Sequence, residues 1–279
     1  MTPRTSSPTT SAATVSLETG GFDVREFART AQGSFRAELD LAAINAASLG
    51  ADALRLLRLL RDLERSTMHR MRNLLVTATH KDARVTAFLT TWAFEKFWIA
   101  DALDAVLEAG DNDHTAEASA GGTRHTLAER AERRGPVRRA IAANFAGPQI
   151  VAAHVTTGLV DEWITQAAYR RLGELAGGLH AVVGRILTIK DRHIRFLAEE
   201  AQRRLAASPR ASKLTRTEVK RAAWPIGAVD RAAADRTFFE TIVFGTPEGA
   251  AEAHRITGML AALPGLASVA PTVSARLVP

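Results

Sequence analysis

The sequence contains no cysteine among its 279 residues. This absence excludes disulfide bonds, cysteine-ligated zinc, iron–sulfur clusters and a thiol nucleophile, and it leaves His, carboxylates, Lys and Tyr for any chemistry. No apolar run reaches the roughly 18 residues of a membrane-spanning helix, and the N-terminus lacks the apolar core of a signal peptide. We therefore expect a cytoplasmic protein with no membrane partner.

Basic residues outnumber acidic residues in this chain. The chain carries 36 Lys and Arg against 30 Asp and Glu, for a formal net charge of +6 and a pI near 10.4. Such a balance would suit a nucleic-acid partner, and arginines concentrate in 130–139 and 203–216. Acidic residues interrupt both clusters, however, and no aromatic residues accompany them for stacking on bases. We interpret them as solvated helix faces and expect no nucleic-acid partner.

Composition divides the chain into three parts. Residues 1–22 are rich in Ser, Thr, Pro and Gly, so we predict a disordered N-terminal tail. Residues 23–209 carry the long apolar periodicities and are predicted to form the main helical domain. Residues 210–279 are divided by Pro and Gly into shorter helical pieces, which we expect to pack on that domain as a C-terminal helical extension.

Almost no segment alternates apolar and polar residues with period two, so the prediction is an all-α protein. After one helix or two short ones within 24–48, the pattern predicts four long helices over 52–76, 83–109, 150–176 and 179–207. Tight turns join the first two and the last two of these helices, whereas the polar stretch 110–148 is long enough to cross the bundle. Two antiparallel hairpins joined by one long crossover form a four-helix bundle.

Four ionisable residues interrupt the apolar helix faces: Glu64, Glu95, Glu162 and His193. Glu64 and Glu95 lie sixteen and fifteen residues from His80 in the first turn, and Glu162 and His193 lie about as far from the second turn. Because a helix rises about 1.5 Å per residue, all four side chains should lie at one depth. Burying an ionisable group alone is costly, so these groups must be paired, neutralised or bound to metal. We predict a buried cluster.

The order and spacing of these residues resemble the ferritin-like di-metal carboxylate proteins, which include desaturases, hydroxylases, N-oxygenases and the ribonucleotide reductase small subunit. In that family the first and third helices each give a Glu, while the second and fourth each give a Glu-x-x-His pair. The segments 92–95 and 190–196 are similar to the family's second-helix and fourth-helix segments. The resemblance covers about residues 52–205 and implies a ferritin-like four-helix bundle with one long crossover.

Two of the six ligand positions depart from the family pattern. Trp98 stands where the family has a His ligand, and Lys190 stands where it has a bridging Glu. An indole cannot coordinate a cation through its N–H, and an ammonium ~4 Å from a divalent ion would add repulsion of ~8 kcal/mol at an effective dielectric of 20. We therefore expect a degenerate di-iron site without a metal cofactor. The alternative is one iron or manganese ion on the remaining ligands: Glu64, Glu95, Glu162 and His193.

We interpret the chain as an enzyme of specialised metabolism that acts on a small organic molecule without a di-metal centre. Glu95, Glu162 and His193 would form a proton shuttle, with Lys190 fixing their charge state. Tyr169 could donate a hydrogen bond to the substrate, although a core aromatic with a satisfied hydroxyl suits it better. The candidate catalytic residues are Glu64, Glu95, Glu162, Lys190, His193 and Tyr169. The candidate substrate-pocket residues are Trp92, Trp98 and Gln166.

Two other functions stay open. The family resemblance implies a metal-dependent oxidase or oxygenase, whereas a fully paired salt-bridge network would suit a non-catalytic binding or structural protein with an inert polar core. A homodimer is a further hypothesis. Leu56, Leu59 and Leu63 form a second apolar stripe away from Glu64, which either a second copy of the chain or the N-terminal helix could cover.

Overall fold

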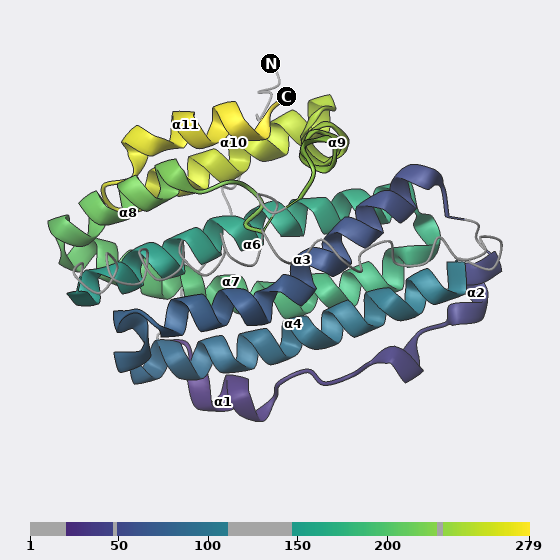
Figure 1. The fold of residues 1–279 in the computed structure, drawn as a ribbon, viewed down its shortest axis with the longest axis horizontal. Helices are drawn as coiled ribbons and strands as arrows, with labels where there is room; N and C mark the ends of the chain where they lie inside the picture. The colour runs from purple at the N-terminus through teal and green to yellow at the C-terminus, as the bar shows by residue number, and fades with distance from the viewer. Residues whose placement is uncertain (1–20, 47–48, 111–146, 228–230) are drawn as a thin grey trace, which may run out of the picture.

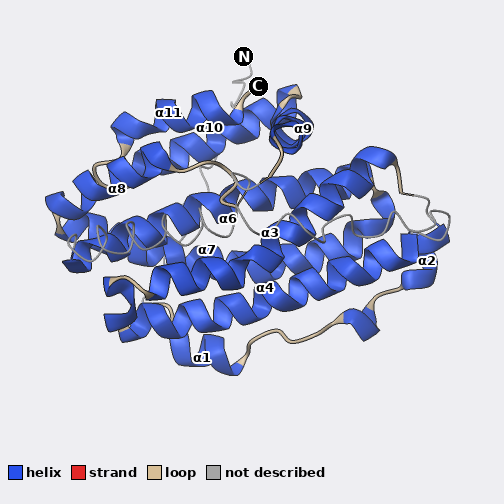
Figure 2. Ribbon diagram, in the orientation of Figure 1, coloured by secondary structure: helices blue, strands red, loops and turns tan. Residues whose placement is uncertain are grey.

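The computed structural model describes residues 21–46, 49–110, 147–227 and 231–279. Within these ranges every regular element is a helix and none is a strand, as Figure 2 shows. The prediction of an all-α protein is therefore confirmed for the described residues. None of the described helices is long and apolar enough to span a membrane.

Four long helices form the centre of the molecule (Figure 1): α3 (Ala51–Leu75), α4 (Ala83–Gly110), α6 (Ile150–Leu175) and α7 (His180–Ala207). Their bounds agree with the predicted ranges to within one or two residues. The 3-10 turn η2 (Ala78–Lys81) joins α3 to α4, and η4 (Gly177–Leu179) joins α6 to α7. Contacts of α3 with α6 and of α4 with α7 hold the two hairpins together. The expected crossover lies mostly outside the described residues.

The ends of these helices follow local hydrogen bonding. Asp82 Oδ1 accepts the backbone N–H of Val85 at 3.0 Å and so satisfies a free donor in the first turn of α4. At the start of α3 the N-cap is Gly50, and Asp52 lies inside the first turn. A carboxylate in the first turn still faces the positive end of the helix dipole, which explains its position.

The N-terminal segment lies along the bundle beside α4 (Figure 1). It contains α1 (Val24–Arg29), the 3-10 turn η1 (Arg36–Glu38) and α2 (Leu41–Ala46). Asp23 caps α1 by accepting two backbone N–H groups of its first turn. Residues 1–20 of the expected tail lie outside the described residues, whereas Phe22 is buried and belongs to the folded part.

The C-terminal extension contains α8 (Pro209–Arg221), α9 (Ala233–Phe244), α10 (Pro247–Ala262), the 3-10 turn η6 (Ala267–Val269) and α11 (Ala270–Leu277). Helices α8, α9 and α10 all contact α6. This cover explains why every residue from 161 to 169 of α6 is buried. The buried apolar residues of the extension join the same core cluster as those of the long helices.

The extension also covers the second apolar stripe of α3. Leu56 is fully buried, and Leu59 and Leu63 line a small groove together with Pro225 and Phe239. The C-terminal extension, which the prediction did not name, therefore packs against part of this stripe, and Leu59 and Leu63 stay partly exposed. A homodimer through this stripe stays a prediction. A sequence pattern marks an apolar face but does not say which distant segment packs on it.

We predict that the extension unfolds together with the bundle. Replacing the buried ring in Phe239→Ala should lower the free energy of unfolding by about 3 kcal/mol, measured by urea denaturation with circular dichroism. The exposed Thr237→Ala change on the same helix is the control and should have little effect. Two separate transitions in the wild-type protein would contradict a shared core.

Candidate functional site

All four long helices contribute to one buried polar cluster near the middle of the bundle. Helix α3 provides Glu64, α4 provides Glu95, α6 provides Glu162 and α7 provides Lys190 and His193. Each of these side chains is at most 2% exposed. The structure thus brings together the four residues that the sequence analysis placed at one depth, and Lys190 joins them.

The cluster contains a second lysine that the sequence analysis missed. Lys96 Nζ lies 3.0 Å from Glu64 Oε2 and 2.9 Å from Glu162 Oε1. Lys190 Nζ lies 3.2 Å from Glu64 Oε1 and 2.6 Å from Glu162 Oε2. Each carboxylate therefore gives one oxygen to each ammonium. We call these four side chains the Glu–Lys square.

Two aromatic side chains complete the hydrogen bonding of the Glu–Lys square. Trp92 Nε1 donates to Glu162 Oε1 at 2.7 Å, and the Tyr169 hydroxyl donates to Glu64 Oε1 at 3.1 Å. Tyr169 is fully buried and also lies under Lys190, with Nζ 5.4 Å from the ring centroid. In this arrangement the only tyrosine of the chain supports the square from inside the core.

Glu95 has a different set of partners. Its Oε2 atom lies 2.7 Å from His193 Nε2, while its Oε1 atom accepts the backbone N–H of Gln32 at 2.8 Å and lies 3.2 Å from Arg192 Nη1. A carboxylate can only accept here, so His193 Nε2 carries the hydrogen. The other ring nitrogen, Nδ1, is buried without a hydrogen-bond partner, 3.9 Å from Glu162 Oε1. We call Glu95, His193 and Arg192 the Glu95 triad.

Charge balances within each part of the cluster. In the Glu–Lys square two carboxylates face two ammonium groups, and in the Glu95 triad one carboxylate faces one guanidinium. Burial alone would raise the pKa of Glu162, but Lys190 and Lys96 outweigh it and hold this pKa well below its ordinary value. Burial likewise would lower the pKa of Lys96, but Glu162 and Glu64 raise it above its ordinary value. The square is therefore held in its charged form.

A di-metal centre does not fit these residues. The two ammonium groups lie between Glu64 and Glu162, where bridging carboxylates would hold cations, and a divalent ion beside them would meet strong repulsion. Among the described residues, no group of three or more His, Asp and Glu side chains could hold a metal ion. This disagreement with the resemblance comes from Lys96 as well as from Lys190.

Trp98 does not enter the cluster, although the resemblance places it at a ligand position. Its ring packs against Phe94 and Phe97, with centroid distances of 6.1 and 5.0 Å, and those two rings are 44% and 53% exposed. Trp98 follows Glu95 by three residues, so its side chain lies about 60° away from that of Glu95 around the helix axis. In this structure that direction is the outer side of α4. The side chain that enters the cluster from α4 is Lys96.

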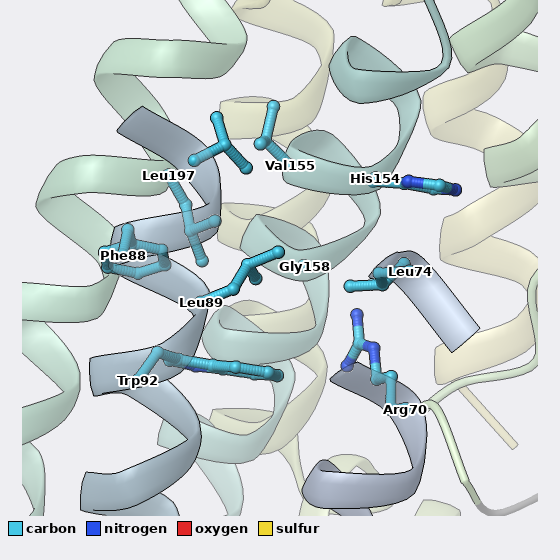
Figure 3. A pocket seen from close by; sticks show the side chains of 10 residues that line it. Arg70, Leu74, Phe88, Leu89, Trp92, His154, Val155, Gly158 and Leu197 are labelled. Carbon is cyan, nitrogen blue, oxygen red and sulfur yellow. The ribbon is translucent and has the colours of Figure 1, made fainter. Parts of the chain in front are cut away.

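The three candidate pocket residues lie apart. Trp92 lines a small pocket between the four long helices (Figure 3), with room for about one water molecule. Neither Trp98 nor Gln166 lines this pocket. Gln166 instead donates to Asp191 Oδ1 at 2.5 Å and accepts from Arg170 at 2.7 Å. The pocket lining is Arg70, Leu74, Val85, Phe88, Leu89, Trp92, His154, Val155, Gly158 and Leu197.

A signal for Lys96 was present in the sequence. Lys96 falls four residues after Trp92 and three before Ile99, so it continues an apolar stripe of α4. A lysine at such a position must be paired if the stripe is buried. For Arg192 no comparable signal exists, because its partners Glu95 and the N-terminal segment lie on other elements.

We predict that the Glu–Lys square is strongly coupled. Lys96→Met leaves a carboxylate uncompensated in the core and should lower the free energy of unfolding by about 3–5 kcal/mol, measured by urea denaturation. Adding Glu64→Met to that variant should recover part of the loss, because one carboxylate and Lys190 then remain balanced. The exposed Lys81→Met change is the matched control. A double variant whose decrease in the free energy of unfolding equals the sum of the decreases in the two single variants would contradict the coupling.

His154 provides a pH prediction. Burial, and then the charge of Arg70, lower its pKa from 6.5 to about 4, while Thr79 Oγ1 lies 2.8 Å from its Nδ1. Below the ordinary pKa the unfolded chain binds a proton that the folded chain does not, so stability falls as pH drops from 6.5 toward 4. Over this pH range the free energy of unfolding of the wild-type protein should fall by about 2 kcal/mol more than that of His154→Gln. Equal decreases in the two proteins, measured by urea denaturation, would assign the pH dependence to other groups.

No protein-family model, no curated protein and no solved structure matches this chain. The function must therefore be argued from the side chains themselves, and no family membership is assigned.

Proposed function

We propose that this chain is a metal-free enzyme that acts on a small organic molecule, with Glu95 as its acid–base group and His193 as the partner of Glu95. The observation that carries the proposal is the difference between the three carboxylates. Glu64 and Glu162 are each held between two ammonium groups, whereas Glu95 bonds a backbone N–H of the N-terminal segment, outside the long helices. Glu95 is thus the carboxylate that a bound molecule can reach by moving that segment.

The chemistry that suits this arrangement is proton transfer. His193 Nε2–H fixes the orientation of Glu95, and Arg192 lies close enough to stabilise its negative charge. His193 Nδ1 is free to take a proton, and Glu162 lies beyond it at 3.9 Å. The Glu–Lys square then lies beside the triad as a rigid neighbour with no net charge. This agrees with the expected role of Lys190, which is to fix the charge state of the neighbouring ionisable groups.

The ferritin-like arrangement belongs to the same proposal. It is supported by the order of two helical hairpins and by the contribution of one or more cluster residues from each long helix. In this view the two lysines have replaced two cations of an ancestral metal site. A metal-dependent oxidase would need those ammonium groups displaced, so we do not favour it. The proposed role in specialised metabolism rests on the resemblance of the sequence to the enzymes of that superfamily.

A non-catalytic protein with an inert polar core is the second candidate. The observation that favours it is the dryness of the cluster, because Glu95, Glu162, Lys190 and His193 are all fully buried. The pocket beside Trp92 includes none of these four side chains in its lining. A paired network of this kind can serve only to set the packing of the helices.

One experiment distinguishes the metal-free enzyme from the non-catalytic protein. Purified protein is incubated with a small-molecule extract of its source organism, with and without a chelator, and the extract is compared by untargeted mass spectrometry. We expect wild type to convert at least one compound in both conditions. His193→Gln should reduce the conversion by about 10²-fold or more, the usual contribution of a positioned acid–base group.

His254→Gln is the control, because His254 is an exposed histidine of α10, outside both the cluster and the pocket beside Trp92. It should convert the same compound as wild type at a similar rate. An extract that no variant changes would support the inert core instead. Conversion that disappears with the chelator would point to the metal-dependent alternative.

A further inference from the structure

The N-terminal segment places two phenylalanine rings directly beside the Glu95 triad. Phe27 of α1 lies 5.3 Å from Phe88, stacked, and 6.1 Å from the His193 ring, edge on. Phe22 lies 5.3 Å from Phe196, and Phe88 stacks on Phe196 at 3.9 Å. We call Phe88, Phe196 and His193 the aromatic box, and residues 22–32 the strap that fills it.

Polar groups of the bundle hold the strap mainly through its backbone. Arg192 donates to Phe27 O at 3.2 Å and to Thr30 O at 3.1 Å, and Arg84 donates to Phe22 O at 2.8 Å. The Gln32 N–H covers Glu95 Oε1. The strap thus offers the bundle a phenyl ring, neutral oxygen acceptors for arginine and one donor for Glu95.

Three guanidinium groups surround the rings. Arg84 lies 5.5 Å from the Phe196 ring centroid, Arg192 lies 4.8 Å from that of Phe27 and Arg195 lies 5.8 Å from that of Phe22. A carboxylate adds its own charge to the hydrogen bond from an arginine and frequently accepts two parallel N–H groups at once, which a single carbonyl oxygen does not. A carboxylate ligand would therefore bind Arg192 better than the strap carbonyls do.

The strap has little stability of its own. Helix α1 has six residues, far fewer than the ~12–15 that an isolated helix needs in water. Its position depends on the two rings and on the hydrogen bonds just described. A ligand that replaces both kinds of contact would release it without unfolding the bundle.

We propose that the aromatic box is the binding site for a small aromatic carboxylate, and that the strap occupies this site as an internal mimic of the ligand. The ligand ring would replace Phe27, its carboxylate would bind Arg192, and displacement of Gln32 would uncover Glu95. This inference rests on the proposed function in so far as it gives Glu95 a substrate. As a binding site it can be tested separately.

The first test is binding of phenylacetate to the full-length protein by isothermal titration calorimetry. Phe27→Ala removes the competing ring, so phenylacetate should bind this variant about ten-fold more tightly than wild type or more. Phe35→Ala is the matched control. Phe35 belongs to the same N-terminal segment and is equally buried, but it lies under Arg185 and away from the box.

The charge requirement is tested by adding Arg192→Gln to Phe27→Ala. This change should weaken phenylacetate binding about ten-fold or more and leave the binding of toluene, which has the ring but no carboxylate, nearly unchanged. Equal binding of phenylacetate to Phe27→Ala and Phe35→Ala would overturn the site. Equal losses for phenylacetate and toluene would overturn the assignment of a carboxylate.

The second test uses the wild-type chain. Saturating phenylacetate should speed hydrogen exchange of the strap amides 24–32 and leave those of α4 and α7 unchanged. Unchanged strap exchange on wild type saturated with phenylacetate would overturn displacement. Phenylacetate binding without conversion of any extract compound would support this site and count against catalysis, whereas conversion by a protein that does not bind phenylacetate would do the reverse.

Discussion

Three carboxylates inside a dry helical bundle must each have a cation within reach, and the rest of the structure depends on this constraint. Lys96 and Lys190 meet it for Glu64 and Glu162, and Arg192 meets it for Glu95. An unpaired buried charge would cost more than most single contacts contribute, so the helices can pack only where these pairs form. The network thus fixes how the helices are rotated about their axes.

The same constraint divides the cluster into an inner and an outer part. The Glu–Lys square lies entirely on the long helices and has no partner elsewhere among the described residues. The Glu95 triad faces the N-terminal segment and shares both Arg192 and Glu95 with its backbone. A rigid interior beside a surface held by a short helix is the arrangement expected where a buried group must be reached from outside.

The periphery of the bundle is covered from two sides by chain segments of different kinds. The C-terminal extension joins the core of the long helices and buries α6 over much of its length. The N-terminal segment is attached through ion pairs, backbone hydrogen bonds and a few rings. Helix α1 of the strap has only six residues and is too short to be stable by itself, so the strap is the weaker cover.

The sequence by itself determined the helices and the common depth of Glu64, Glu95, Glu162 and His193, because hydrogen bonding within a helix is local and its rise per residue is constant. Only the tertiary structure decided which neighbouring residues enter the core. Lys96 points inward and Trp98 outward, and Phe239 of the C-terminal extension shares a groove with Leu59 and Leu63. These outcomes depend on how each helix is rotated against its neighbours and on contacts between residues far apart in the chain, which no local pattern records.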